Sequence, residues 1–169
     1  KLPDEARANV YGRANDPDPT GYKDKGLIVA YGDDIYAVAD CLGVCRFVTR
    51  GFNSPHLLGY QDFCDSVAAA TGLEYTPASL RDVGRRTLDT ERLINAGFGL
   101  TRADDTLPKR YFDDPMPARK TKGHHVDREQ FQLMLDEYYA ERGWDADGRV
   151  SAERIAEIDG LNDVIAGCS

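Results

Sequence analysis

The sequence LIVAYGDDIYAVADCLGVC, residues 27–45, decides the fold class of this chain. Its apolar residues recur at spacings of three and four, which is the period of an α-helix with one face turned toward a core. They are Leu27, Ile28, Tyr31, Ile35, Val38, Ala39 and Leu42. We therefore predict a helix over about residues 27–42. Gly43 interrupts the pattern. Since glycine has no Cβ, the backbone there can turn sharply or lie close to a ligand.

Two further helical patterns follow this stretch. Residues 59–70 carry an apolar stripe, and Gly72 is placed to end a helix there. Thr76 followed by Pro77 is a strong helix start, since Thr can cap free amides and Pro suits the first helical position. The sequence predicts that this second, longer helix extends to about Ala96, before two glycines stop it.

The clearest helical pattern begins after Asp127. Asp127 is placed to cap the helix and Gln130 to complete a capping box, while the apolar face includes Tyr138 and Tyr139. These tyrosines fit a core stripe better than a binding platform. Trp144 should pack beneath the turn that follows this helix. A shorter helix is expected to open after Ser151.

Turn-forming residues separate the helical segments. Residues 1–25 are rich in Pro, Asp and Gly and predict an extended arm, which leaves 26–169 as one helical domain. Residues 101–125 have the same character and predict an irregular strap across the surface. No strand-like alternation longer than four residues occurs. The predicted class is therefore mainly α, an irregular helical domain with long surface straps.

The bulk composition excludes several functions. A net charge of −8 and a pI of about 4.8 argue against binding to nucleic acid or to an anionic membrane surface, because both need clustered cations. The longest mainly apolar stretch, residues 26–31, is far too short to cross a bilayer, so no membrane segment is expected. Four unevenly spaced cysteines do not predict a disulfide-stapled secreted domain, and a reducing cytoplasm fits them better. They are Cys41, Cys45, Cys64 and Cys168, and their structural interpretation is as small buried side chains.

Most of the chemically capable residues have an ordinary structural interpretation. The histidines (His56, His124, His125) lie in loop-like contexts with no nucleophile motif beside them, which predicts surface positions. The acidic pairs (Asp33-Asp34, Asp104-Asp105, Asp113-Asp114) lack the spacing of a calcium loop. We predict that these pairs are solvated or ion-paired with Arg102, Lys109 and Arg110.

One stretch does not fit a purely structural interpretation, and it runs from Asp40 to Cys45. An apolar setting raises the cost of a free carboxylate, so Asp40 should face a hydrogen-bond donor, which a ligand rich in ring N–H groups could supply. Gly43 would admit such a ligand close to the main chain. Cys45 would then lie beside it as a soft ligand for iron, although one or two sulfurs cannot complete a cluster site.

These residues resemble the aldehyde ferredoxin oxidoreductase family, whose C-terminal half carries the pattern Asp-x-x-Gly-Leu-Cys. Here the pattern is Asp40-Cys41-Leu42-Gly43-Val44-Cys45, with Val44 in the place of the usual Leu. That replacement removes one methylene and should preserve an apolar wall. The resemblance continues in order at residues 90–95, 102–110, 122–124 and 138–145, and covers about residues 26–161.

The resemblance implies an enzyme that oxidises aldehydes to carboxylic acids at tungsten, or less commonly molybdenum, held by two pyranopterins. A nearby 4Fe–4S cluster would pass electrons to ferredoxin. On this basis Cys45 corresponds to the last of four cluster ligands, Asp40 accepts hydrogen bonds from one pterin, and the main chain of Gly43 and Val44 lines the same pterin. The Glu and His that the family places near the metal belong to the upstream region, so the resemblance assigns no catalytic residue on this chain.

The resemblance also implies that essential parts lie upstream. The family's other three cluster cysteines and its pterin-binding N-terminal domain precede the region that this chain resembles, so cluster and tungsten cofactor would both be shared with that region. We expect the chain to be inactive alone and to act together with the upstream region, and the expected partners include a second copy of the protein. Two alternatives remain open: a class II benzoyl-coenzyme A reductase subunit of the same architecture, and a noncatalytic helical domain for assembly.

Overall fold

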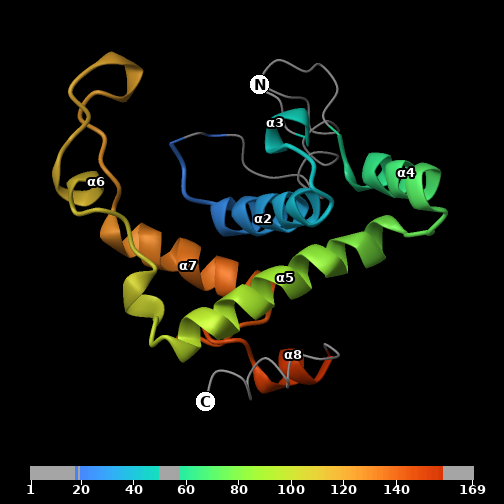
Figure 1. The fold of residues 1–169 in the computed structure, drawn as a ribbon. Helices are drawn as coiled ribbons and strands as arrows, with labels where there is room; N and C mark the ends of the chain where they lie inside the picture. Colours follow the sequence, from blue (N-terminus) through green and yellow to red (C-terminus); the bar gives the residue numbers. More distant parts are fainter. Residues whose placement is uncertain (1–17, 19, 50–57, 158–169) are drawn as a thin grey trace.

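The computed structural model describes residues 18, 20–49 and 58–157, and they are mainly helical (Figure 1). The α-helices in chain order are α2 (Lys25–Cys41), α3 (Arg46–Thr49), α4 (Tyr60–Thr71), α5 (Pro77–Gly97), α6 (Arg110–Asp113), α7 (Arg128–Arg142) and α8 (Ala152–Glu157). Two 3₁₀ turns, η1 (Arg102–Asp104) and η2 (Arg119–Thr121), lie between α5 and α7. β-Structure within the described residues is limited to a single bridge between Trp144 and Val150. The predicted mainly α class is confirmed; most of the predicted arm, His56 and Cys168 lie outside the described residues.

Helix α2 lies at the centre of the arrangement. It packs along both α5 and α7, and α4 packs on α5 (Figure 1). The apolar stripe predicted for α2 forms the hydrophobic core together with α4 and the start of α5. The core residues are Tyr31, Ile35, Val38, Ala39, Tyr60, Phe63, Cys64 and Leu80. Burial of this stripe is what fixes the direction in which the end of α2 points.

The helix ends follow the local signals, with one difference. Thr76 accepts a hydrogen bond from the Ser79 amide at the start of α5, and Gly72 has a left-handed φ of +77° after α4, as predicted. At the start of α7, Asp127 Oδ1 accepts from the Gln130 amide at 2.9 Å. The reciprocal half of the predicted capping box is wrong, because the Asp127 amide donates to the Tyr22 hydroxyl at 2.8 Å instead. This contact ties the residues before α2 to the start of α7.

A buried ion-pair network joins the three long helices. Asp34 on α2 is 1% exposed and pairs with cations of other helices, so the prediction that its acidic pair is solvated or paired with Arg102, Lys109 or Arg110 is wrong for this residue. Arg142 of α7 donates to Asp34 and, at 3.0 Å, to the Ala30 carbonyl oxygen. Arg81 of α5 donates its Nε–H to the other Asp34 oxygen at 3.0 Å. Two cations therefore neutralise one buried carboxylate. Without them, an unpaired charge at this buried position would strongly destabilise the fold.

The predicted irregular strap, residues 101–125, contains only the short elements η1, α6 and η2. The Met116 amide donates to the His124 carbonyl at 2.8 Å and the Val126 amide to the Tyr111 carbonyl at 2.8 Å, so the segment folds back on itself. Asp105 anchors its start by a two-pronged ion pair with Arg92 of α5, at 3.0 and 2.7 Å. Hydrogen bonds within the segment and an ion pair to α5, rather than helical periodicity, hold this segment in place.

Candidate functional site

The candidate site is the C-terminal end of α2 and the turn that follows it. The Gly43 amide donates to the Asp40 carbonyl at 3.0 Å and the Val44 amide to the Ala39 carbonyl at 2.9 Å. With φ of +68° at Gly43, these two bonds form a Schellman turn, which requires a left-handed residue at this position. Val44 packs against the core, as the apolar residue after such a turn commonly does. The turn thereby sends the chain back past the helix end.

The four residues singled out by the sequence lie together at this turn but face different ways. Asp40 and Cys45 are exposed, and so is Gly43, around which an added Cβ would meet nothing within 4 Å. Val44 alone is half-buried. Since Cys41 is also exposed, the interpretation of the cysteines as buried side chains is wrong for Cys41 and Cys45 and correct for Cys64.

Arg46 holds the Asp40 carboxylate. Its Nε–H donates to Asp40 Oδ1 at 3.1 Å, and an Nη2–H donates to Oδ2. These hydrogen bonds keep the pKa of Asp40 below its usual value. The guanidinium also lies over the Tyr36 ring, with Cζ 5.3 Å from the ring centroid. Asp40 was expected to face a hydrogen-bond donor, and Arg46 of the same chain is such a donor. The expected apolar setting is wrong, because the Asp40 side chain is 50% exposed.

Sequence reasoning missed both Arg46 and Tyr36. A signal for Tyr36 was available, because residues four apart on a helix share a face and Tyr36 precedes Asp40 by four. No comparable signal marked Arg46, since its approach to Asp40 depends on how the turn redirects the chain. The local fold, rather than helical periodicity, makes the pair.

A small polar cavity of about 280 Å³ opens beside this helix end. Its lining comes from α2, α5 and Arg46. The cavity residues are Asp33, Tyr36, Ala37, Asp40, Cys41, Arg46, Thr87, Leu88 and Glu91. Cys41 Sγ lies 3.5 Å from the Thr87 hydroxyl oxygen, so its thiol has a polar partner on α5. The cavity is thus acidic and polar on the side of α2.

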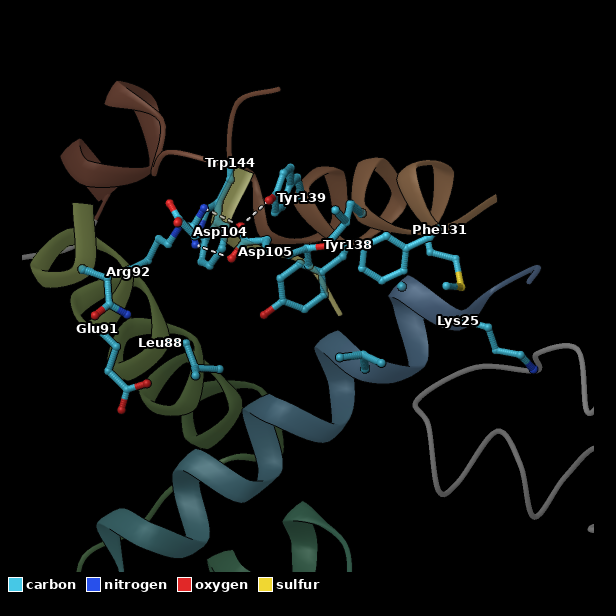
Figure 2. Close-up of a pocket in the computed structure, with 16 residues that line it drawn as sticks. Lys25, Leu88, Glu91, Arg92, Asp104, Asp105, Phe131, Tyr138, Tyr139 and Trp144 are labelled. Carbon is cyan, nitrogen blue, oxygen red and sulfur yellow. Dashed lines mark hydrogen bonds and ion pairs between the residues drawn. The ribbon is translucent and has the colours of Figure 1, made fainter. Parts of the chain in front are cut away.

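A larger apolar cavity of about 570 Å³ lies where α2, α5 and α7 meet (Figure 2). Tyr138, Tyr139 and Trp144 line it, together with Leu88 and Glu91, which also line the small cavity. The two cavities therefore adjoin across the same face of α5. Tyr138 and Tyr139 belong to the predicted apolar stripe of α7, and together with Trp144 they also form a wall of this cavity.

Three polar side chains in the wall of the larger cavity, Arg92, Tyr139 and Trp144, are already paired within the chain. Arg92 is engaged by Asp105, the Tyr139 hydroxyl also donates to Asp105, and Trp144 Nε1–H donates to Asp89 Oδ1 at 2.8 Å. Figure 2 shows the first two of these interactions as dashed lines. Because these three donors are satisfied, the aromatic wall of the cavity offers mainly apolar surface.

Asp33, at the edge of the small cavity, should make stability depend on pH. Burial raises the pKa of Asp33 above 3.8, although the Tyr138 hydroxyl and Arg142 oppose this shift. The native state then binds a proton more tightly than the unfolded chain, so the free energy of unfolding falls as pH rises through the raised pKa. Asp33→Asn removes this contribution. The stability of this variant relative to the unchanged chain, measured by urea unfolding, should therefore increase as pH rises from 3.8 through the raised pKa of Asp33. A difference that stays constant with pH contradicts the assignment.

No three His, Cys, Asp or Glu side chains cluster closely enough to hold a metal ion in the part of the chain that the structure describes. Among those same residues, no helix is both long and apolar enough to span a membrane.

Comparison with known proteins relates most of the chain to one family. Residues 4–159 match the family described as aldehyde ferredoxin oxidoreductase, domains 2 & 3. The chain is 38% identical over 136 residues to the tungsten-containing aldehyde ferredoxin oxidoreductase of Pyrococcus furiosus, covering 80% of this chain and 21% of that protein. It is 39% identical over 126 residues to the enzyme of the same name from Thermococcus kodakarensis, covering 74% and 19%. The chain thus spans about a fifth of the length of these relatives.

The fold itself recurs in a solved structure. The active site complex BamBC of benzoyl coenzyme A reductase, in complex with 1,5-dienoyl-CoA, superposes with a TM-score of 0.67. The match covers 89% of this chain and 21% of that chain at 22% identity, which shows a shared fold.

Proposed function

This chain belongs to the aldehyde ferredoxin oxidoreductase family and corresponds to its C-terminal domains, and on that premise we propose its function in the complete enzyme. That enzyme oxidises an aldehyde to a carboxylic acid at a tungsten bispyranopterin, with molybdenum as the less common metal. A 4Fe–4S cluster passes the electrons to ferredoxin. The single observation that carries this proposal is that Asp40 and Cys45 are both exposed at one turn, available to groups outside the domain.

The residues of the turn fit the two cofactors. Cys45 presents an exposed thiol, the kind of ligand that an iron–sulfur cluster requires. Asp40 already receives two parallel N–H donors, so its carboxylate is oriented to accept ring N–H groups. At Gly43 the open space beyond the backbone would let a flat ring approach the main chain closely. Val44 supports this surface from the core side.

The cofactors supply the redox chemistry, in which an aldehyde gains an oxygen from water and releases two protons and two electrons. The contribution of this chain is to bind and orient. Cys45 would hold one corner of the cluster, while Asp40 and the Gly43–Val44 main chain would hold one pterin. A single thiolate cannot hold a cluster, so the other three ligands must come from the region upstream. That region, ferredoxin and a second copy of the protein are the proposed partners.

Exposed apolar side chains at the turn support the proposal that another domain covers this surface in the complete enzyme. Leu42, inside the Asp40–Cys45 segment, is 37% exposed, and Phe47, two residues after it, is 72% exposed. Neighbouring apolar groups at a polar site are typical of a surface that another domain covers. This favours a role inside a larger enzyme over a self-contained assembly domain.

Replacing Cys45 with alanine tests the cluster assignment. In protein that contains the upstream region, Cys45→Ala should remove most of the iron, because a cluster with three thiolate ligands is readily lost. Iron per polypeptide and the visible absorbance of the cluster are the measurements. Cys41→Ala is the matched control, since its thiol is also exposed but is paired with Thr87, and it should retain iron.

Each result decides a different part of the proposal. Unchanged iron in Cys45→Ala would exclude this residue as a ligand. The reaction itself is tested by assaying aldehyde oxidation against a viologen dye alongside reduction of benzoyl-coenzyme A. Activity with the thioester and none with aldehydes would replace the proposed reaction by the benzoyl-coenzyme A alternative.

A further inference from the structure

We propose that Arg46 is a positioning residue, which holds the Asp40 carboxylate in the orientation that the pterin ring requires. The inference rests on the proposed function, because it concerns how the same site prepares one of its residues. It adds a residue outside the Asp40–Cys45 pattern. The mode of action is indirect, through Asp40, rather than by contact with the reacting atoms.

The geometry of the pair carries the first step. Arg46 uses the Nε–H and Nη2–H edge of its guanidinium, one N–H on each oxygen of Asp40. A planar fork on a planar carboxylate fixes the plane of the acid as well as its position. Tyr36 fixes the guanidinium in turn, because Arg46 Cζ lies 5.3 Å from the centroid of its ring. Three side chains thus form one ordered stack on the surface of α2.

The position of Asp40 explains why the carboxylate needs such a partner. Asp40 lies in the last turn of α2, where the exposed carbonyl groups carry partial negative charge and disfavour an anion. The last turn of α2 contains no basic residue to offset this. At 50% exposure the Asp40 side chain would otherwise be free to rotate toward solvent. The Arg46 guanidinium places a positive charge beside Asp40 at the helix end. This charge offsets the unfavourable helix dipole, and the hydrogen bonds restrict rotation of the Asp40 side chain.

Binding of Arg46 leaves Asp40 able to accept a ligand. Each carboxylate oxygen has two lone pairs, and Arg46 occupies one on each. One acceptor position per oxygen remains for ring N–H groups. Arg46 therefore orients the carboxylate and still leaves each oxygen able to accept a further hydrogen bond. A positioning residue is expected to have this property.

The experiment compares cofactor binding in the complete protein with variants at both positions. Arg46→Ala should lower the pterin bound per polypeptide at limiting cofactor about fivefold, the scale of a well-aligned exposed ion pair. Arg46→Lys should restore less than half of the loss, because an ammonium restores the charge but not the fork. Pterin is measured as its fluorescent oxidation product, with tungsten by elemental analysis. Thermal unfolding should be nearly unchanged, since both side chains are largely exposed.

A double-variant cycle separates this inference from the proposed function. If Arg46 acts through Asp40, then Arg46→Ala should have no further effect on pterin content in an Asp40→Ala background. Arg86→Ala is the control, because Arg86 is an exposed cation of α5. It should leave pterin content unchanged.

The outcomes that would overturn the inference are distinct. Unchanged pterin in Arg46→Ala, full rescue by Arg46→Lys, or additive losses in the double variant each exclude positioning through Asp40. If instead Asp40→Ala itself leaves pterin content unchanged, the pterin role of Asp40 fails, and with it both proposals at this residue.

Discussion

Replacing Arg142 with methionine is expected to lower the free energy of unfolding by about 3 to 4 kcal/mol. The variant keeps the length of the side chain but removes the charge and the donors that satisfy Asp34 and the Ala30 carbonyl. Both charged side chains are 1% exposed, so water cannot take over the role of the lost cation without opening the helix junction. Arg81 remains on the other oxygen of Asp34, which limits the loss. Urea or guanidinium unfolding measures the change.

Arg128→Met is the matched control for this variant. Arg128 lies on the same helix and also pairs with an aspartate, Asp113, but its side chain is 59% exposed. Exposed pairs of this kind contribute little, so the control should lose less than about 1 kcal/mol. Comparable losses in the two variants would mean that burial of the Arg142 pair does not determine its contribution.

Replacing Gly84 with alanine is expected to lower the free energy of unfolding by about 3 kcal/mol, at the upper end of overpacking effects. A Cβ at this position would lie 2.2 Å from the carbonyl oxygen of Asp34 and 3.1 Å from Cγ2 of Val38. The nearest atom belongs to the backbone of α2, so relief requires the two helices to separate. Separation would weaken the buried ion pair of Asp34 as well, since Arg81 reaches it from α5.

Gly32→Ala provides the comparison for Gly84→Ala. Gly32 is also inside a helix, α2, and an added Cβ there would meet nothing within 4 Å. Alanine should raise the free energy of unfolding here by about 0.5 to 1 kcal/mol, since it favours the helix. Thermal and urea unfolding of the pair should therefore shift in opposite directions. If Gly84→Ala leaves the free energy of unfolding unchanged, α2 and α5 must pack less closely at this crossing than these distances indicate.

The local elements of the fold were predictable because their signals lie within a few residues of one another. Periodicity at spacings of three and four identified α2, and Thr76, Gly72 and Asp127 marked helix ends that the structure bears out. The turn at Gly43 belongs to the same class. It closes hydrogen bonds to carbonyl groups of Ala39 and Asp40, so its geometry follows from the sequence of one short segment.

The site was predictable only in part. Asp40, Gly43, Val44 and Cys45 came from the family resemblance, and their functional roles remain predictions. Arg46, in contrast, is adjacent to the pattern yet gave no sequence signal, because its contact with Asp40 depends on the direction in which the turn releases the chain. The reciprocal half of the capping box at Asp127 was wrong for the same reason, since the hydroxyl that accepts from the Asp127 amide comes from Tyr22.

The sequence by itself determined the long helices, most of their ends and the turn at Gly43, since hydrogen bonds between near neighbours and apolar periodicity are local properties. Only the tertiary structure decided which charges are buried. Asp34 meets cations 47 and 108 residues away, and nothing around it in the sequence distinguishes it from Asp33. The helix crossing at Gly84 is equally nonlocal, because the atom that excludes a side chain there belongs to another helix.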